Sequence, residues 1–303
     1  MSRGKALLYR VVVTIVILLG IGLLAYPSVS NWYNDMHRSR AIAVYENAIA
    51  GLSDVDFESM FEQARAYNNS LIGNAKRFSP DDAELESYNQ ILDVTGTGIM
   101  GYIEIPKINV KLPIYHTVEE TVLQIAAGHM PGTSFPIGEI GSHTVISGHR
   151  GLPSAKLFTH LDELDAGDLF QVHVLNKTMV YEIYEVEVVL PEDMDSLRIS
   201  SDRNLITLVT CTPYGVNSHR ILVHAEQTDK IISSDDDSNS NSNLDTENKQ
   251  SDGGSDFDFD FNFRDDFGLV LIAVFVVLML AFAVYNRRCK HNNHTAGGQD
   301  SSE

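Results

Sequence analysis

The chain has 303 residues, of which 44% are hydrophobic and 21% charged, a composition that excludes a wholly disordered or fibrous protein. Its net charge of −19 argues against a protein that grips the phosphates of nucleic acid, so we expect no nucleic-acid partner. The two cysteines, Cys211 and Cys289, are too few for a disulfide scaffold and are predicted to lie on opposite sides of a membrane, which leaves Cys211 as a free thiol.

The first predicted element is a membrane span near the N-terminus. The apolar run covers 11–26 and extends back to Ala6 if Arg10 snorkels, which is long enough to cross a bilayer. Basic residues precede the run and place the N-terminus in the cytoplasm. Cleavage as a signal peptide at Ser28-Val29-Ser30 is the alternative. We assign residues 1–29 to the cytoplasmic N-terminus and this span.

Residues 30–97 are expected to form a helical extension outside the membrane. Within the helical part, 31–72, Ser53 followed by Asp56 is a capping-box pattern, and Gly73 is typical of a helix end. A partial apolar face lies between these signals, made of Phe57, Phe61, Ala64 and Leu71. Turn formers and acids follow over 73–97, around Pro80-Asp81-Asp82.

Residues 98–228 are predicted to form an all-β domain. Short β-branched runs alternate there with Gly, Pro and Asn, and strands at this density favour a sandwich or barrel. The runs are Met100–Ile105, Thr144–Ser147, Leu169–Leu175, Val180–Leu190, Leu205–Thr210 and Arg220–Ala225.

The residues that carry chemistry lie at the ends of three of these runs. Cys211 ends a buried-strand pattern beside a Pro/Gly turn, where a thiol is held rigidly and can face a groove; a lone cysteine is, however, more often a buried structural residue. Arg220 opens the next run, so the two side chains can face one groove, where a guanidinium can stabilise an oxyanion. His149 follows another strand and supplies an imidazole for acid–base chemistry.

These residues resemble the sortase family, whose signature is Thr-Leu-x-Thr-Cys with a downstream Arg. Five blocks in the same order resemble class C, the sortases that polymerise pilins, and together they cover about 97–225. The blocks are Gly101–Ile108, Leu112–His116, Ser147–Pro153, Thr207–Cys211 and Cys211–Arg220.

The resemblance implies an eight-stranded closed β-barrel and a cysteine transpeptidase. It implies that Cys211 is the nucleophile, His149 the general acid/base and Arg220 the residue that positions substrate or stabilises the oxyanion. Neighbouring Thr210, Thr212 and Asn217 are assigned to substrate binding, and 131–138 and 216–219 to the groove. No cofactor or metal is expected.

The implied partners are pilin or surface proteins with a Leu-Pro-x-Thr-Gly sorting signal, cleaved between Thr and Gly, and a lysine amine of a pilin subunit as acceptor. Two alternatives within the same fold are a housekeeping sortase that anchors surface proteins to the cell wall and a thiol hydrolase that uses water. A catalytically silent, membrane-tethered binding module is the third class of function.

One segment departs from the class C pattern. Class C sortases usually carry a lid with an Asp-Pro-aromatic motif, and here Phe78, Pro80 and Asp81 are present in a different order. We keep a lid within 73–93 as a hypothesis, with these three residues as its candidates.

Other polar residues have weaker interpretations. His129, His143, His160 and His219 lie in the β domain without a tight metal-ligand spacing, which disfavours a zinc site with Cys211. The acidic group Asp162, Glu163 and Asp165 is interpreted as a solvated turn, with calcium binding as the alternative.

The C-terminal part is predicted to return to the membrane. Residues 229–266 are an acidic, disordered linker, in which Phe257, Phe259, Phe261 and Phe263 alternate with Asp or Asn; the alternative is that these rings sit at the lipid headgroups. Residues 267–285 are a second span, and the basic tail 286–303, with an idle or lipidated Cys289, is cytoplasmic. The expected protein is therefore a two-pass membrane protein with an extracellular catalytic domain.

Overall fold

The computed structural model of this protein describes residues 3–152 and 155–232. Within them, eight strands close into a barrel in the spatial order β1-β2-β3-β4-β7-β8-β6-β5. The β2–β3 and β4–β7 pairs are parallel, and the other pairs are antiparallel. The strands are β1 (Ile99–Ile105), β2 (Val110–His116), β3 (Ala127–His129), β4 (Ser142–Ser147), β5 (Leu169–Val174), β6 (Lys177–Val189), β7 (Asn204–Thr212) and β8 (His219–Thr228).

The eight-stranded barrel expected from the resemblance is confirmed, and each predicted run lies in a strand or extends one residue beyond its end. Two strands, β2 and β3, are not among those runs. Lys111 and Pro113 interrupt the apolar pattern of β2, and β3 is only 3 residues long, too short for periodicity to reveal. Both are set by their neighbours in the barrel rather than by local propensity.

The barrel interior is the main hydrophobic core. Strand residues alternate between the interior and the outer face, so Ile206 and Leu208 of β7 join the core, whereas Val209 packs in a separate cluster outside it. That outer cluster consists of Val145, Leu197, Val209 and Leu222. It lies on β4, β7, β8 and the loop between β6 and β7, and it matters for the site described below.

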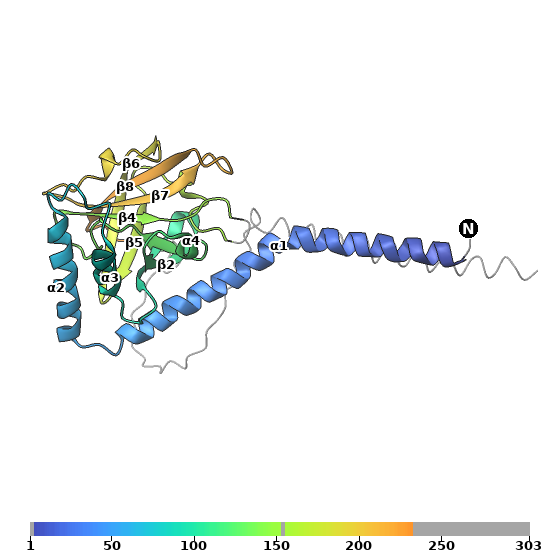
Figure 1. Cartoon of the computed structure of the whole chain (residues 1–303), viewed down its shortest axis with the longest axis horizontal. Helices are drawn as coiled ribbons and strands as arrows, with labels where there is room; N and C mark the ends of the chain where they lie inside the picture. Colours follow the sequence, from blue (N-terminus) through green and yellow to red (C-terminus); the bar gives the residue numbers. More distant parts are fainter. Residues whose placement is uncertain (1–2, 153–154, 233–303) are drawn as a thin grey trace, which may run out of the picture. The chain divides into compact units, whose positions relative to one another are not determined.

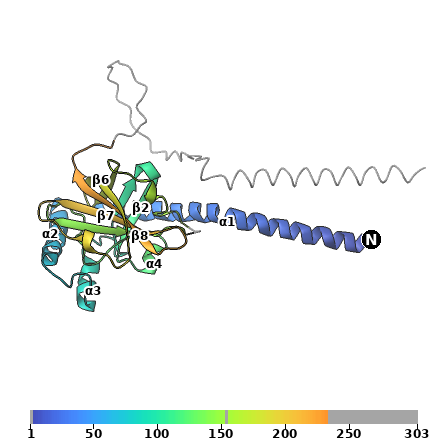
Figure 2. The same cartoon turned by 90° about the horizontal axis from the view of Figure 1, so that it is seen from above.

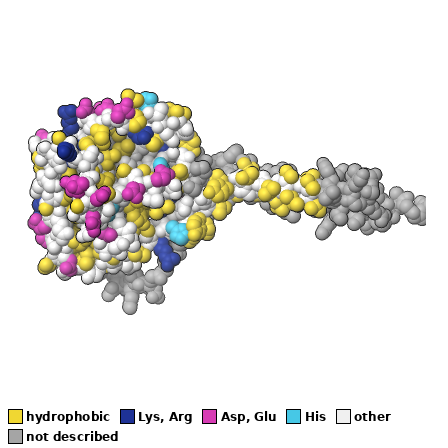
Figure 3. Space-filling view, viewed as in Figure 1, with side chains coloured by type: hydrophobic (Ala, Val, Ile, Leu, Met, Phe, Trp, Pro, Cys, Tyr) yellow, Lys and Arg dark blue, Asp and Glu magenta, His cyan; other side chains and the backbone are white. Residues whose placement is uncertain are grey.

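The N-terminal helix α1 (Arg3–Ile49) contains one segment apolar enough to cross a membrane. Its residues from Val11 onward expose apolar side chains along the helix, as Figure 3 shows. Ser28-Val29-Ser30 lies inside this helix. The predicted linker from residue 233 onward, the second span 267–285 and the tail with Cys289 lie outside the described residues.

The N-terminal extension ends in two further helices. The end of α1 docks on the barrel, because the Tyr45 hydroxyl donates to the Met100 carbonyl (3.0 Å) and accepts from the Leu175 amide (2.8 Å). Helix α2 (Asp54–Leu71) begins at the predicted Ser53 capping box and buries Phe61, Ala64 and Leu71. Figures 1 and 2 show α2 and α3 (Asp82–Gln90) outside the barrel. Acidic side chains are spread over this face of the molecule (Figure 3).

Helix α3 corrects the expectation that 73–97 consists of turns. Asp81 is its N-cap: the carboxylate accepts from the Glu84 amide (2.9 Å), and the Glu84 carboxylate accepts from the Asp81 amide (2.9 Å). This reciprocal pair is a capping box, which satisfies donors at the start of a helix. The sequence signal was present in Asp81-Asp82-Ala83-Glu84, but the cluster of acids and Pro80 reads equally well as a turn.

His129 and His143, two of the buried histidines, are expected to make the fold acid-sensitive. Burial lowers the pKa of His129 to about 3 and that of His143 to about 4, whereas an unfolded imidazole titrates near its ordinary value of 6.5. Unfolding therefore takes up protons as pH falls below that value, and the free energy of unfolding should fall by about 1.4 kcal/mol per pH unit for each histidine between about pH 6 and pH 4. Urea unfolding midpoints at pH 7.5, 6 and 5 would measure this.

The control for this prediction is His160→Gln, which removes a partly exposed histidine and should leave the pH dependence unchanged. His143→Gln should reduce the slope, because one of the buried imidazoles with a lowered pKa is removed. A midpoint that is constant from pH 7.5 to pH 5 would contradict the assignment.

Candidate active site

The site begins with two residues that face each other across neighbouring strands. Cys211 of β7 and Arg220 of β8 are direct partners in the antiparallel register, and directly opposed residues share one face of a sheet. This register places both residues near the ends of adjacent strands, in agreement with the positions expected from the sequence. Cys211 is half-buried and free of disulfide bonding, so it is not the fully buried structural cysteine of the alternative interpretation.

His149 is held beside Cys211 by the pairing of β4 with β7. The Gly148 amide donates to the Val209 carbonyl (3.0 Å), and the Thr210 hydroxyl donates to the Gly148 carbonyl (2.7 Å). A Cβ on Gly148 would lie 2.6 Å from the Phe158 ring, so only glycine fits there. These bonds place His149 next to the strand that carries Cys211.

The three residues share one cleft with an apolar lining. Its volume is about 270 Å³, and Cys211, His149 and Arg220 all line it. The apolar residues that line it include Val118, Leu123, Met130, Val189, Leu190, Pro191, Met194, Leu197, Val209 and Leu222. Several of them belong to the outer cluster defined above. The cleft therefore offers an apolar trough with a thiol, an imidazole and a guanidinium along it.

Arg220 is oriented by the loop that joins β7 to β8. Its Nη1 donates to the carbonyls of Asn217 (3.1 Å) and His219 (3.0 Å). Asn217 has a left-handed backbone, with φ of +58°, which asparagine tolerates better than most residues. Asn217 thus contributes its carbonyl to the site, and its side chain is exposed to solvent.

Thr210 and Thr212, both assigned from sequence to substrate binding, have structural partners. The Thr210 side chain is buried, and its hydroxyl is committed to Gly148. The Thr212 hydroxyl accepts from Nη1 of Arg150 (3.1 Å), and the same guanidinium is paired with the Asp162 carboxylate. This bridge joins the end of β7 to the loop after His149. Arg150 was missed from sequence, although it is adjacent to His149.

The acidic group after this loop is explained by ion pairs. Asp162 pairs with Arg150, Glu163 with His160 and Asp165 with Lys107. All three acidic residues are exposed, as a solvated turn requires, and these pairings add surface partners to that interpretation. No group of three or more metal-ligating side chains occurs among the residues that the structure describes.

Glu120 is a second residue that sequence reasoning missed. It begins the short helix α4 (Glu120–Leu123), and its Oε2 lies 3.2 Å from Nε2 of His149. The side-chain amide of Gln124 donates to Oε1 of Glu120 (3.1 Å). The hydrogen bond from Gln124 and the charge of His149 lower the pKa of Glu120. A carboxylate is therefore ionised beside the imidazole, where it can orient the ring.

The other histidines of the barrel do not line the cleft. His129 is fully buried, accepting at Nδ1 from Tyr88 (2.7 Å) and donating at Nε2 to the Ser134 carbonyl (2.9 Å). His143 donates at Nδ1 to the Arg198 carbonyl (2.8 Å), and its Nε2 accepts from the Thr207 hydroxyl (2.7 Å). Both are structural. His219 is half-exposed, and its Nδ1 lies 2.9 Å from the Ser218 hydroxyl.

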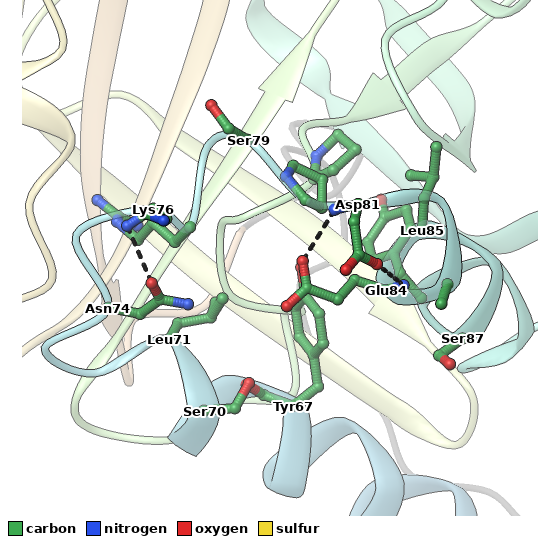
Figure 4. Close-up of a pocket in the computed structure, with 15 residues that line it drawn as sticks. Tyr67, Ser70, Leu71, Asn74, Lys76, Ser79, Asp81, Glu84, Leu85 and Ser87 are labelled. Carbon is green, nitrogen blue, oxygen red and sulfur yellow. Dashed lines mark hydrogen bonds between the residues drawn. The ribbon is translucent and has the colours of Figure 1, made fainter.

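The three candidate lid residues lie outside the lining of the cleft. Asp81 caps α3, and Pro80 borders a separate cavity of about 690 Å³ between α2 and α3; Figure 4 shows that cavity, with Tyr67 on one side and the Asp81–Glu84 pair on the other. Phe78 alone approaches the site, because it packs against the outer cluster. The backbone in this region therefore lies beside the cleft, and no Asp81 plug is formed.

Comparison with known proteins agrees with this geometry. A family model described as the sortase domain matches residues 103–228. Sortase A of Streptococcus agalactiae serotype III (strain NEM316) is 27% identical over 220 residues, which cover 71% of this chain and 82% of that protein. Sortase D of Bacillus subtilis (strain 168) is 29% identical over 114 residues, 38% of this chain and about half, 54%, of that protein.

Solved structures show a closer similarity. Sortase C1 from Streptococcus agalactiae has 42% sequence identity and a TM-score of 0.61, with 63% of this chain and 100% of that chain covered. Sortase C-1 from Actinomyces oris has 41% identity and a TM-score of 0.54, covering 57% and 99%. Clostridium perfringens sortase C, solved with the C-terminal cell wall sorting motif, has 37% identity and a TM-score of 0.55, covering 63% and 100%.

Proposed function

The chain belongs to the sortase family, and we propose that it is a membrane-anchored class C sortase, a cysteine transpeptidase that joins a sorting signal to an amine. The observation that carries the proposal is the opposition of Cys211 and Arg220 across β7 and β8, with His149 in the same cleft. The similarity to sortase C structures supports class C within the family.

In the proposed reaction, Cys211 acts as a thiolate and attacks the carbonyl carbon of the threonine in a Leu-Pro-x-Thr-Gly signal. The carbonyl oxygen becomes an oxyanion, which Arg220 stabilises by charge and hydrogen bonding. His149 donates a proton to the departing glycine nitrogen as the C–N bond breaks, and a thioester on Cys211 remains.

A lysine amine of a pilin subunit then resolves the thioester. The nitrogen attacks the thioester carbonyl, His149 removes its proton, and the thiolate leaves as an isopeptide bond forms. Glu120 is the group beside His149 that stabilises the imidazolium during both steps, because its carboxylate lies 3.2 Å from Nε2.

The apolar cleft suits the leucine and proline of such a signal. A neighbour of this chain, the Clostridium perfringens sortase C, was solved with the C-terminal cell wall sorting motif, which supports the same class of substrate here. Thr212 follows the nucleophile in β7 and Asn217 binds Arg220 through its carbonyl, so we propose that both contact the signal. Thr210 acts through Gly148 instead.

The proposed location is the cell membrane, with the barrel outside. Helix α1 supplies an apolar segment that can anchor the chain. The two-pass arrangement with both ends in the cytoplasm rests on the sequence of 267–285 and the Arg287-Arg288 pair that follows it.

The proposal is tested with the full chain in detergent, incubated with a Leu-Pro-x-Thr-Gly peptide and a lysine-bearing acceptor peptide. We expect mass spectrometry to detect the Leu-Pro-x-Thr fragment joined to the acceptor amine, and no product from a peptide with the same composition in scrambled order. Release of the free acid alone, with acceptor present, would identify a hydrolase instead. Absence of both products would contradict a sorting-signal transpeptidase.

A further inference from the structure

Two loops contribute much of the cleft lining, and both lie outside the strands of the barrel, although the Met130 amide donates to the Val145 carbonyl of β4 (2.9 Å). The loop between β6 and β7, residues 190–203, supplies Met194 and Leu197, and the turn 130–133 supplies Met130. The turn is closed by the Thr133 amide and hydroxyl, which both donate to the Met130 carbonyl (3.2 and 2.7 Å). The width of the cleft therefore depends on what holds these two loops together.

One side chain of the N-terminal extension binds both loops. Nη1 of Arg77 donates to the Gly132 carbonyl in the turn (3.0 Å), and Nη2 donates to the Leu197 carbonyl in the 190–203 loop (2.7 Å). The backbones of Arg77 and Gly132 also lie close together, because a Cβ on Gly132 would be 1.9 Å from the Arg77 carbonyl oxygen. The next carbonyl along, that of Arg198, accepts from His143.

Both hydrogen-bond partners given above for the Arg77 guanidinium are uncharged carbonyls. Arg77 is half-buried, and no carboxylate among the described residues forms an ion pair with it. Its guanidinium carbon lies 4.1 Å from the centroid of the Phe78 ring, a cation–π contact. Placing a cation in a partly desolvated position without a counter-charge is unfavourable, which indicates that the arrangement serves geometry rather than stability.

The packing around Arg77 is otherwise sparse. Cavities of about 690 Å³ and 530 Å³ both border this residue, and Ile72 to Lys76 are exposed. The segment is therefore fixed mainly by the two carbonyl bonds of Arg77 and by Phe78, whose ring packs on the outer cluster with Met130 and Met194.

We propose that Arg77 is a positioning residue for the substrate cleft, which ties the 130–133 turn to the 190–203 loop and sets the distance between their apolar side chains. The proposal rests on the proposed function for its substrate. The segment around Arg77 then supports the cleft, so that removing the Arg77 hydrogen bonds weakens peptide binding. If the segment were a plug over the active site, removing these bonds would strengthen peptide binding.

The test is a comparison of Arg77→Ala with the wild-type full chain in detergent. A hydrogen bond from a charged donor is worth more than about 1.4 kcal/mol, so we expect KM for the sorting peptide to rise about tenfold or more, with kcat changed less than about threefold. Arg77→Lys should give an intermediate KM, because an ammonium group lacks the fork that reaches both carbonyls. The matched control is Lys76→Ala, which removes the adjacent exposed positive charge and should leave KM unchanged.

A second measurement keeps the result independent of the substrate. Amide hydrogen exchange of 130–133 and 190–199 should be faster in Arg77→Ala and unchanged in Lys76→Ala, while labelling of Cys211 by a small thiol reagent keeps its wild-type rate. Unchanged exchange in both loops would overturn the proposal. So would a lower KM in Arg77→Ala, which would identify the segment as a plug. If the wild type fails to process the peptide but the exchange result holds, the substrate assignment has failed and the positioning role has not.

Discussion

Replacing Cys211 with alanine is expected to abolish the thioester and to lower turnover by at least about 10⁴-fold, the scale on which removal of a catalytic nucleophile acts. The side chain is half-buried at the end of β7, and alanine fits the same strand position. Arg220 keeps its hydrogen bonds to the Asn217 and His219 carbonyls. His149 stays in place because the adjacent Gly148 keeps its backbone bond to Val209. The loss is therefore one of chemistry, and the thermal unfolding midpoint should change little.

Cys211→Ser sharpens this prediction. Serine has nearly the same shape, but the pKa of a hydroxyl is far above that of a thiol, so no anion is available near neutral pH. We expect the serine variant to bind peptide with a KM near the wild-type value where turnover is measurable, and to accumulate no acyl adduct by intact-protein mass spectrometry. A peptide-sized adduct on Cys211→Ala would show that another group is the nucleophile.

Strand patterns predicted an all-β domain and the facing positions of Cys211 and Arg220, whereas the closed eight-stranded barrel was implied by the family resemblance. The alternation of side chains along a strand places Val209 and Cys211 on one face of β7. The Pro/Gly turn after β7 reverses the chain, so β8 is expected to run antiparallel beside it. The pairing of Cys211 with Arg220 follows from the positions at which the two runs end and begin. The strand-end position of His149 was also read from the sequence, but its grouping with Cys211 in one site required the family resemblance, because β4 is parallel to β7 and distant from it in sequence.

Residues that act through loops were not predictable in this way. Glu120, Arg150 and Arg77 reach the site from segments without periodicity, and their partners are a side chain or a backbone carbonyl elsewhere in the chain. Glu120 is separated from His149 by 29 positions. Arg77 lies in the stretch assigned to a possible lid, where the capping role of Asp81 was also missed. Tertiary packing alone brings these groups together.

The second large effect is expected from Arg220→Lys, which should lower kcat/KM by about 10² to 10³-fold, as loss of an oxyanion donor does. Nη1 of Arg220 is held by two carbonyls, those of Asn217 and His219. The guanidinium has further N–H groups besides those of Nη1, and Arg220 lines the same cleft as Cys211. A lysine ammonium is a single point of donation on a flexible stem, so it cannot keep both carbonyls and also address an oxyanion beside Cys211.

The matched control for Arg220→Lys is Arg203→Lys. Arg203 pairs with Glu226 at the opposite end of β8, on the partly exposed surface, and lysine there can retain the charge interaction. Steady-state kinetics on both variants should show the loss only for Arg220→Lys, mainly in kcat, because the planar guanidinium is needed most when charge develops on the carbonyl oxygen. Equal activity in wild type and Arg220→Lys would remove Arg220 from the mechanism. Backbone amides alone would then have to stabilise the oxyanion of the tetrahedral intermediate.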